Sequence, residues 1–259
     1  MSFSVRISTM LAIFLSSFWI FPFVFGAAKP SRSSRNYERS LDSWVSVGHN
    51  GNWPCSSDEI EVIENAVEYT KILANGAIVA LDDTGTSSSA YLRWFGDGNA
   101  YESDLETIRE YHYEAVISEL RAPESGTVDS VEEGGEDPER LVYACPAAGD
   151  SFCASGEAAA VVNAGDYGFS VNLLYVCPSF FNKVSHSRML SNWRQGTYTP
   201  SAGLVLLHEM QHLDAVVGSE RRSVDHAFSV RGCEDLDDEE KITNAQNFAF
   251  FALDVTASP

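Results

Sequence analysis

The segment from Gly203 to Asp214 holds two histidines and a glutamate within an otherwise apolar run of helical spacing. His208 and His212 lie four residues apart, so on a helix their side chains project from one face and can reach a single metal ion. Glu209 lies beside the pair, where it can accept a proton from a zinc-activated water instead of ligating the ion. A histidine pair can also lie on the surface without any function. Burying these polar groups in an apolar helix, however, is costly in free energy without a partner such as a metal. The segment therefore predicts a buried helix with a His-Glu-x-x-His site for one Zn²⁺ ion.

A catalytic zinc site needs a third protein ligand and an open position for water. The longer motif His-Glu-x-x-His-x-x-Gly-x-x-His is absent, because Ala215 and Gly218 occupy its last two positions. Asp214 follows His212 too closely and faces the wrong side of a helix. Several residues further along could supply the ligand, and spacing alone does not choose among them: Glu220, Asp225, His226, Glu234 and Glu239.

Acidic residues outnumber basic ones, with 37 Asp and Glu against 17 Lys and Arg and a formal charge of -20. A field of this sign repels phosphate backbones and anionic lipid surfaces, which argues against nucleic-acid binding. A solvated acidic surface accounts for most of the charge. The length of 259 residues, with 44% hydrophobic content, is enough for one sizeable core or at most two small ones.

The N-terminus has the pattern of a signal peptide over residues 1–28. Arg6 precedes an apolar stretch from Met10 to Phe25, and small residues at 26–28 offer a cleavage site. The stretch is short for a membrane anchor, which needs about 20 residues. Residues 29–53 are rich in Ser, Arg, Asn and Gly and predict a flexible lead-in or a short pro-segment, followed by one domain over residues 54–259. The mature protein is expected to be secreted and free of the membrane.

Five cysteines lie in the mature part, where an oxidising compartment favours disulfides. Cys145 and Cys153 flank a short loop and are the easiest pair, and Cys177 with Cys233 is a plausible second. Sequence alone leaves the connectivity open, and one cysteine remains over. No Cys-x-x-Cys pair is present, which argues against a thiolate zinc site.

The remaining patterns predict an α+β domain that is mainly helical with a small sheet. Periodic apolar residues indicate helices over 58–73, 88–95, 103–120, 202–217 and 243–255. Short apolar runs separated by Gly and Asp turns indicate strands over 141–144, 158–163 and 170–176. Between them, residues 123–139 combine Pro, Gly, Ser and acids and predict an exposed loop.

Beyond the zinc motif, the chain resembles the aspzincin metalloendopeptidases, the deuterolysin and lysine-specific metalloendopeptidase group of secreted enzymes. The matching segments follow one another in the family's order over 91–96, 173–181, 206–218, 225–233 and 244–253. The resemblance implies a single zincin-like domain with one Zn²⁺ ion. It assigns His208, His212 and Asp225 as metal ligands and Glu209 as the general base. His226 remains the competitor of Asp225.

Three positions depart from the family pattern. Arg221-Arg222 stands where the family has Gly-Thr, so the loop that delivers Asp225 is expected to turn differently. Phe228 replaces a Tyr whose hydroxyl steadies the oxyanion, and losing one such donor costs about 10²–10³ in rate. Gln246 and Ala249 stand where lysine-specific members carry two acids, which argues against strict lysine specificity.

Together these observations predict a secreted, monomeric zinc metalloendopeptidase that acts on protein or peptide substrates. It would hydrolyse peptide bonds through a zinc-activated water, with Glu209 as the general base. The main alternative is a non-catalytic secreted zinc-binding protein or effector derived from such a peptidase, which Phe228 favours. A third alternative is a secreted structural or surface protein whose histidine pair binds no metal.

Overall fold

The computed structural model describes residues 41–46, 53–124, 127–128, 131–132 and 136–258. The expected signal peptide and most of the expected lead-in lie outside these residues, so the predictions for them stay predictions. None of the helices in the described part is long and apolar enough to cross a membrane.

Within the described residues, five strands form one sheet in the order β2-β1-β3-β5-β4. The strands are β1 (Asp42–Ser46), β2 (Thr127–Val128), β3 (Asp137–Ala144), β4 (Ala159–Val162) and β5 (Val171–Val176). Neighbours pair in parallel except for β4, which runs antiparallel to β5 and forms one edge of the sheet. Strand β1 corrects the expectation that residues 29–53 form only a flexible lead-in, because it pairs with both β2 and β3. Strands β2 and β3 likewise take up part of the expected loop at 123–139.

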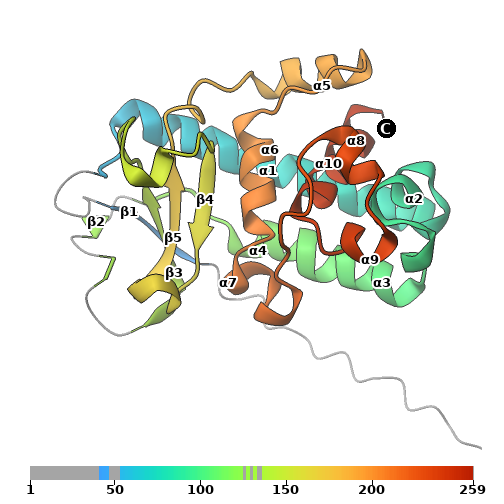
Figure 1. Ribbon diagram of the computed structural model, residues 1–259, viewed down its shortest axis with the longest axis horizontal. Helices are drawn as coiled ribbons and strands as arrows, with labels where there is room; N and C mark the ends of the chain where they lie inside the picture. The colour runs from blue at the N-terminus through green and yellow to red at the C-terminus, as the bar shows by residue number, and fades with distance from the viewer. Residues whose placement is uncertain (1–40, 47–52, 125–126, 129–130, 133–135, 259) are drawn as a thin grey trace, which may run out of the picture. The chain divides into compact units, whose positions relative to one another are not determined.

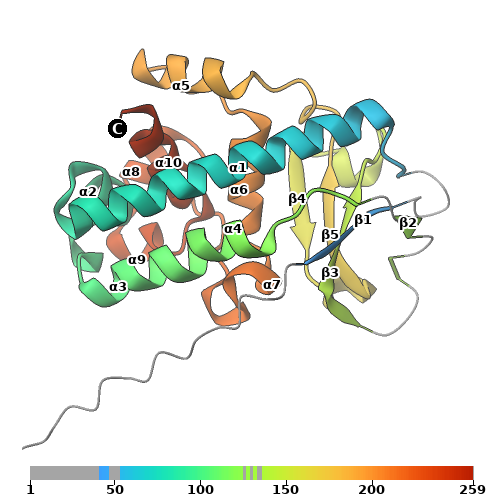
Figure 2. The same cartoon turned by 180° about the vertical axis from the view of Figure 1, so that it is seen from behind.

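Helices make up most of the rest of the described chain, and the predicted α+β fold class is confirmed. The helices are α1 (Ser57–Thr84), α2 (Ser89–Phe95), α3 (Glu102–Thr107), α4 (Ala115–Glu119), α5 (His186–Arg194), α6 (Ala202–Met210), α7 (Asp214–Val217), α8 (Val230–Glu234), α9 (Asp238–Lys241) and α10 (Ala245–Ala257). Figure 1 shows α6 between the sheet on one side and α2, α8, α9 and α10 on the other. Figure 2 shows α1 running from the sheet to α2.

Helix α1 begins at a capping box, in which the Ser56 side chain accepts from the Glu59 amide and the Glu59 side chain accepts from the Ser56 amide. The helix extends to Thr84, well beyond the predicted end at residue 73. Its buried face continues through small side chains, which give a weak periodic signal in the sequence. The buried residues are Ile63, Ala66, Val67, Thr70, Leu73, Ala74, Ala77 and Leu81.

The predicted helix over 103–120 is interrupted by a π-helical segment from Ile108 to Glu114, which joins α3 to α4. Segments of this kind re-aim side chains relative to a regular helix. Here the segment carries the buried side chains of His112 and Tyr113.

Helix α6 lies unusually close to α1. The Thr70 hydroxyl lies within hydrogen-bond distance of two carbonyls, that of Ala66 at 2.7 Å and that of Gly203 at 2.8 Å, and its single proton can be donated to either. A Cβ atom added at Gly203 would lie 2.7 Å from the Cβ of Tyr69. Only a glycine therefore allows this approach without displacement of one helix. The predicted helix over 202–217 ends at Met210, and the chain turns through His212 before α7 begins.

The disulfides join Cys55 to Cys145 and Cys153 to Cys177, whereas Cys233 is free and buried. Both predicted pairs, Cys145 with Cys153 and Cys177 with Cys233, are therefore wrong. Cys145 follows β3, and its amide donates to the Trp53 carbonyl at 2.9 Å, which brings it beside Cys55. The disulfides therefore join cysteines that the fold brings together, and not those separated by the fewest residues in the sequence.

Candidate metal centre

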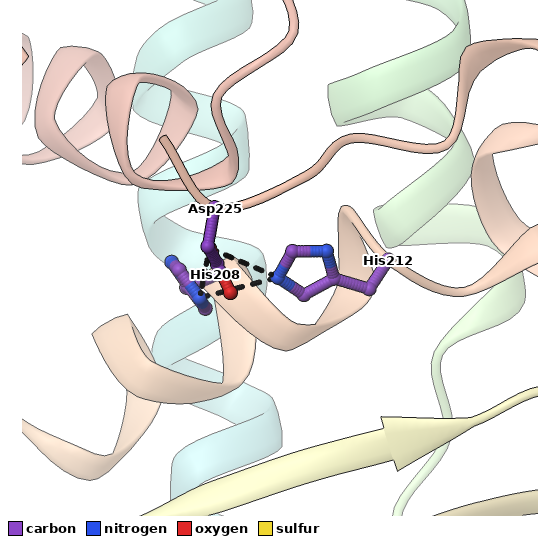
Figure 3. A group of neighbouring side chains, drawn as sticks. All are labelled: His208, His212 and Asp225. Atoms are coloured by element: carbon purple, nitrogen blue, oxygen red, sulfur yellow. Dashed lines mark hydrogen bonds and ion pairs between the residues drawn. The ribbon is translucent and has the colours of Figure 1, made fainter. Parts of the chain in front are cut away.

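Three of the predicted site residues converge at the C-terminal end of α6 (Figure 3). The Nε2 atoms of His208 and His212 are 3.3 Å apart. One Asp225 carboxylate oxygen, Oδ1, lies 3.3 Å from each of these nitrogens. The three atoms therefore form a nearly equilateral triangle.

This triangle fits a tetrahedral zinc ion. Zinc ligands at 2.0–2.1 Å in tetrahedral positions lie about 3.3–3.4 Å from one another. Two imidazole nitrogens and one carboxylate oxygen are also a donor set that zinc accepts. The His212 Nδ1 atom lies 2.8 Å from the Ser223 carbonyl and donates its proton there. The Nε2 lone pair of His212 is therefore left to face the centre of the triangle.

The charges at the triangle favour a cation. Burial alone would raise the pKa of Asp225, but its contacts with His208 and His212 hold that pKa below its usual range. The pKa of His212 is raised, because the attraction of Asp225 and Glu209 outweighs the opposing effect of burial. Both shifts follow from one property of the site, which stabilises positive charge between these side chains.

Glu209 precedes Met210 at the end of α6 and lines a cavity that His208 also lines. Its side chain is buried, with 6% exposure, and its carboxylate has no hydrogen-bond partner among the described residues. Burial raises the pKa of Glu209 to about 7, although His208 and His212 act in the opposite direction. A carboxyl with a pKa in this range can both accept and return a proton near neutral pH.

Asp225 comes from the loop between Gly218 and α8, and the two arginines of this loop have partners. The Arg221 guanidinium lies over the Tyr111 ring, 3.8 Å from its centroid, and its Nε donates to the Val217 carbonyl. Arg222 lies 3.4 Å from an Asp214 carboxylate oxygen. The loop thus positions Asp225 beside His208 and His212 even though it carries Arg221 and Arg222.

The other candidates for the third ligand do not join this group. His226 directs its Nε2 to the Thr243 hydroxyl at 3.1 Å, and Glu234 pairs with Arg93. Glu220 pairs with Arg221, and Glu239 is exposed on α9. Of the five residues that spacing left open, the structure therefore brings only Asp225 to the histidine pair.

A cavity of about 200 Å³ opens beside His208 and Glu209. Its lining comes from β4, the segment before α6, α6 itself, the loop after Asp225 and α10, with these residues: Glu157, Ala158, Ala159, Tyr198, Pro200, Leu204, Val205, His208, Glu209, Phe228 and Gln246. The Gln246 amide donates to the Tyr198 hydroxyl at 3.3 Å. Phe228 is 60% exposed, and its ring centroid lies 5.9 Å from that of His208. Ala249 is buried and does not line the cavity.

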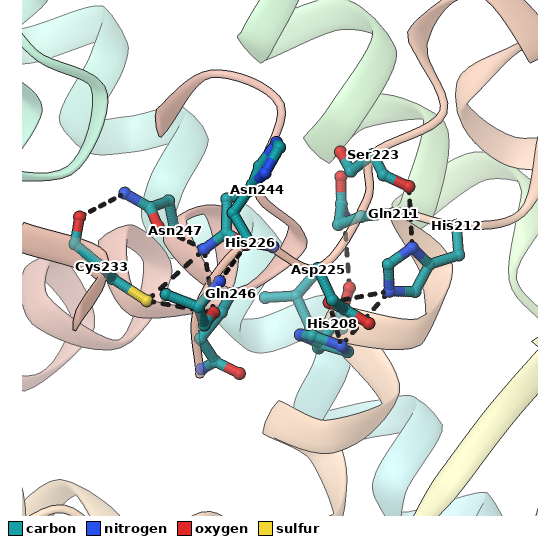
Figure 4. Close-up of polar contacts among 12 residues, drawn as sticks. His208, Gln211, His212, Ser223, Asp225, His226, Cys233, Asn244, Gln246 and Asn247 are labelled. Atoms are coloured by element: carbon teal, nitrogen blue, oxygen red, sulfur yellow. Dashed lines mark hydrogen bonds and ion pairs between the residues drawn. The ribbon is translucent and has the colours of Figure 1, made fainter. Parts of the chain in front are cut away.

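Sequence reasoning missed the polar residues that hold the ligand-bearing segments. Asn163, which follows β4, donates to the His212 carbonyl at 3.1 Å and accepts from the Asp214 amide at 2.7 Å. Gln211 is fully buried and contacts His112. Asn244 contacts the loop that carries Asp225 (Figure 4). The available signal was a polar residue within an otherwise apolar stretch, as at Gln211.

Comparisons with known proteins agree with this architecture. Among solved structures, a zinc peptidase from Grifola frondosa superposes with a TM-score of 0.53 at 18% sequence identity, covering 77% of this chain and 97% of that chain. None of the curated protein sequences compared with this chain matches it. The family model described as lysine-specific metallo-endopeptidase, that of the aspzincins, matches residues 80–253. The chain therefore belongs to the aspzincin metalloendopeptidase family.

Proposed function

We propose that this chain is a secreted zinc-dependent endopeptidase in which His208, His212 and Asp225 hold one Zn²⁺ ion. The observation that carries the proposal is the 3.3 Å triangle of two Nε2 atoms and one carboxylate oxygen, with Glu209 next to it in the chain. When bound, Zn²⁺ supplies a Lewis acid that activates water and polarises a carbonyl. In this proposal, a peptide bond is hydrolysed at the end of α6.

Glu209 acts as the general base in this proposal. Its unpartnered carboxylate faces the cavity and takes a proton from the attacking water. The resulting carboxylic acid then gives the proton to the leaving amine, which returns Glu209 to its starting state. In the metal-free site burial raises the pKa of Glu209, which favours a carboxyl that can take up a proton and release it again.

The edge strand β4 and the adjoining cavity support a peptide substrate. One side of β4 pairs with β5, and its other side lies at the edge of the sheet, where an extended peptide can add as a further strand. Ala158 and Ala159 border the cavity next to His208, so a substrate side chain could occupy the cavity while its backbone follows β4. The chain would act as a monomer on protein or peptide substrates and would have no nucleic-acid partner.

Two disulfides support secretion, because such bonds persist in oxidising compartments. This agrees with the signal peptide expected over residues 1–28. Export with removal of that segment would leave the mature chain outside the cell and free of the membrane.

A second candidate is a secreted zinc-binding protein that has lost catalysis. Phe228 favours it, because its ring lies beside His208 and carries no hydroxyl to donate to an oxyanion. Glu209 argues against it, since zinc binding alone requires no base at this position.

Cleavage of an unfolded protein by the purified mature chain tests the two candidates. Proteolysis by the zinc-loaded chain should stop with a chelator and resume when zinc is restored. Glu209→Gln keeps the size of the side chain but removes its basicity, so it should retain zinc and lose at least about 10³-fold in kcat. Cleavage at the wild-type rate by this variant would refute the mechanism. No cleavage by folded, zinc-loaded wild type would favour the non-catalytic candidate.

A further inference from the structure

Asp225 lies on a loop that buries little of its own surface. Its neighbours Val224 and Phe228 are 50% and 60% exposed, and the Asp225 side chain is 34% exposed. Apolar burial alone therefore does not fix the position of the carboxylate. A ligand on a loose loop would also lose conformational freedom each time a metal bound, which weakens binding.

Asn244, the residue before α10, holds this loop through its side-chain amide (Figure 4). Its Oδ1 accepts hydrogen bonds from the amides of His226 at 2.8 Å and Ala227 at 3.2 Å. Its Nδ2 donates to the Ala227 carbonyl at 3.1 Å. One side chain, fully buried, thus engages both residues that follow Asp225.

The backbone on the other side of Asp225 is attached at the same place. Val224 and Asn244 form a parallel bridge, in which the Val224 amide donates to the Thr243 carbonyl at 2.9 Å. The Ala245 amide donates to the Val224 carbonyl at 3.0 Å. Asp225 is therefore bracketed by attachments to residues 243–245 immediately before and immediately after it.

The amide of Asn244 has a fixed orientation. Its Nδ2 donates to the Asn247 Oδ1 atom at 2.6 Å, and the Nδ2 of Asn247 donates to the Trp94 carbonyl at 2.6 Å and to the Cys233 carbonyl at 3.3 Å. Because Asn247 presents its oxygen to Asn244, the oxygen of Asn244 is left to face the loop amides. The fold thereby sets which atoms of Asn244 the loop meets.

We propose that Asn244 is a positioning residue for the metal site, which holds Asp225 at the correct distance from His208 and His212 before metal binds. The inference rests on the proposed zinc site and assigns Asn244 no contact with the ion. Outer-shell partners of this kind typically contribute about 10–100-fold to metal affinity.

Zinc affinity and apo-protein stability, measured in parallel, test this role. Asn244→Ala removes all the side-chain contacts with the loop and should weaken zinc binding about 10–100-fold. Tyr113→Phe is the matched control, because it removes a buried hydrogen bond to the Phe248 carbonyl in the same helix without touching the loop. The control should lower the melting temperature of the apo protein and leave zinc affinity within about twofold. Equal zinc affinities for folded Asn244→Ala and Tyr113→Phe would overturn the proposal.

Amide hydrogen exchange of the metal-free wild-type chain gives a second readout that needs no variant. The amides of His226 and Ala227 should exchange at least about tenfold more slowly than expected for an exposed loop, because Asn244 accepts both. Exchange at the unprotected rate would overturn the proposal even if Asn244→Ala did not fold. Protected amides in a wild-type chain that binds no zinc would refute the proposed zinc site while leaving the hold on the loop intact.

Discussion

Gln211 accepts a hydrogen bond from His112, with 2.8 Å between its Oε1 and the imidazole Nδ1. Gln211 lies between His208 and His212 in the chain, whereas His112 belongs to the π-helical segment. The His112 ring also stacks on Phe248, with centroids 4.1 Å apart. The pair therefore connects the turn at the metal site to two other parts of the helical core.

This pair predicts a loss of stability in mild acid. Burial lowers the pKa of His112 to about 4, below the ordinary value of 6.5 that applies to the unfolded chain. The unfolded state consequently binds the proton first, so the stability from neutral His112 is present above about pH 6.5 and is lost as pH falls toward about 4. The loss from this residue is up to about 3 kcal/mol.

Urea unfolding of the metal-free chain at several pH values measures this effect. His112→Gln keeps a donor for Gln211 but does not titrate. It should be less stable than wild type at pH 8, and the gap should narrow as the pH is lowered across the same window. Stability curves that remain parallel from pH 8 to pH 4 would contradict the prediction.

Asp225 and His226 are neighbours that should behave differently toward zinc. Asp225→Ala removes one corner of the 3.3 Å triangle. Loss of an outer-shell partner typically weakens metal binding about 10–100-fold, and loss of Asp225 should weaken zinc binding by more than this. His226→Ala is the control, because its side chain contacts Thr243 instead. Zinc titration of the two variants checks this. An unchanged affinity in Asp225→Ala would show that another residue supplies the third ligand.

Restoring a hydroxyl at Phe228 should speed hydrolysis. The ring lines the cavity, lies 5.9 Å from the His208 ring and is 60% exposed, so the added oxygen has room. Phe228→Tyr should raise kcat at least about tenfold, since a positioned donor to an oxyanion contributes about 10²–10³. Phe228→Leu, which adds no donor, should not raise kcat. Equal kcat values for Phe228→Tyr and wild type would argue against an oxyanion role for this position.

The cavity should not restrict cleavage to lysine. Its lining includes the uncharged Tyr198 and Gln246 together with the acids Glu157 and Glu209, so no acid stands at position 246. Wild type should therefore cleave peptides with Lys or Leu beside the scissile bond at kcat/KM values within about tenfold of each other. Gln246→Glu adds a further carboxylate to the cavity and should shift this ratio toward Lys by at least about tenfold, whereas Gln246→Met should not. A strict requirement for Lys in wild type would refute this interpretation.

The helices that position the site could largely be predicted from the sequence, because helical periodicity is a local signal. His208 lies on α6, as expected from its apolar pattern, whereas His212 lies in the turn after the helix ends at Met210. The errors occurred at the ends of helices. Helix α1 continues past residue 73 through Ala74 and Ala77, whose small side chains mark a buried face only weakly.

Features that depend on contacts between distant parts of the chain could not be predicted in this way. Strand β1 has no internal periodic signal and exists through pairing with β2 and β3. Cys55 meets Cys145 across 90 residues, whereas the nearer Cys153 pairs elsewhere. The choice of Asp225 likewise came from the family resemblance, because spacing left five candidates. Asn163 and Asn244 received no role, since an isolated Asn in a sequence does not indicate which loop its amide will hold.

The contact between Gly203 and α1 has a consequence for how this fold tolerates change. Gly203 lies five residues before His208, far from any chemistry, yet the missing side chain sets how near α6 can approach Tyr69. Because α6 is a rigid rod over this distance, any displacement at its start is transmitted to the imidazole at its end. The separation of the two helices thus sets one dimension of the proposed metal site, and a methyl group added outside the site would alter it.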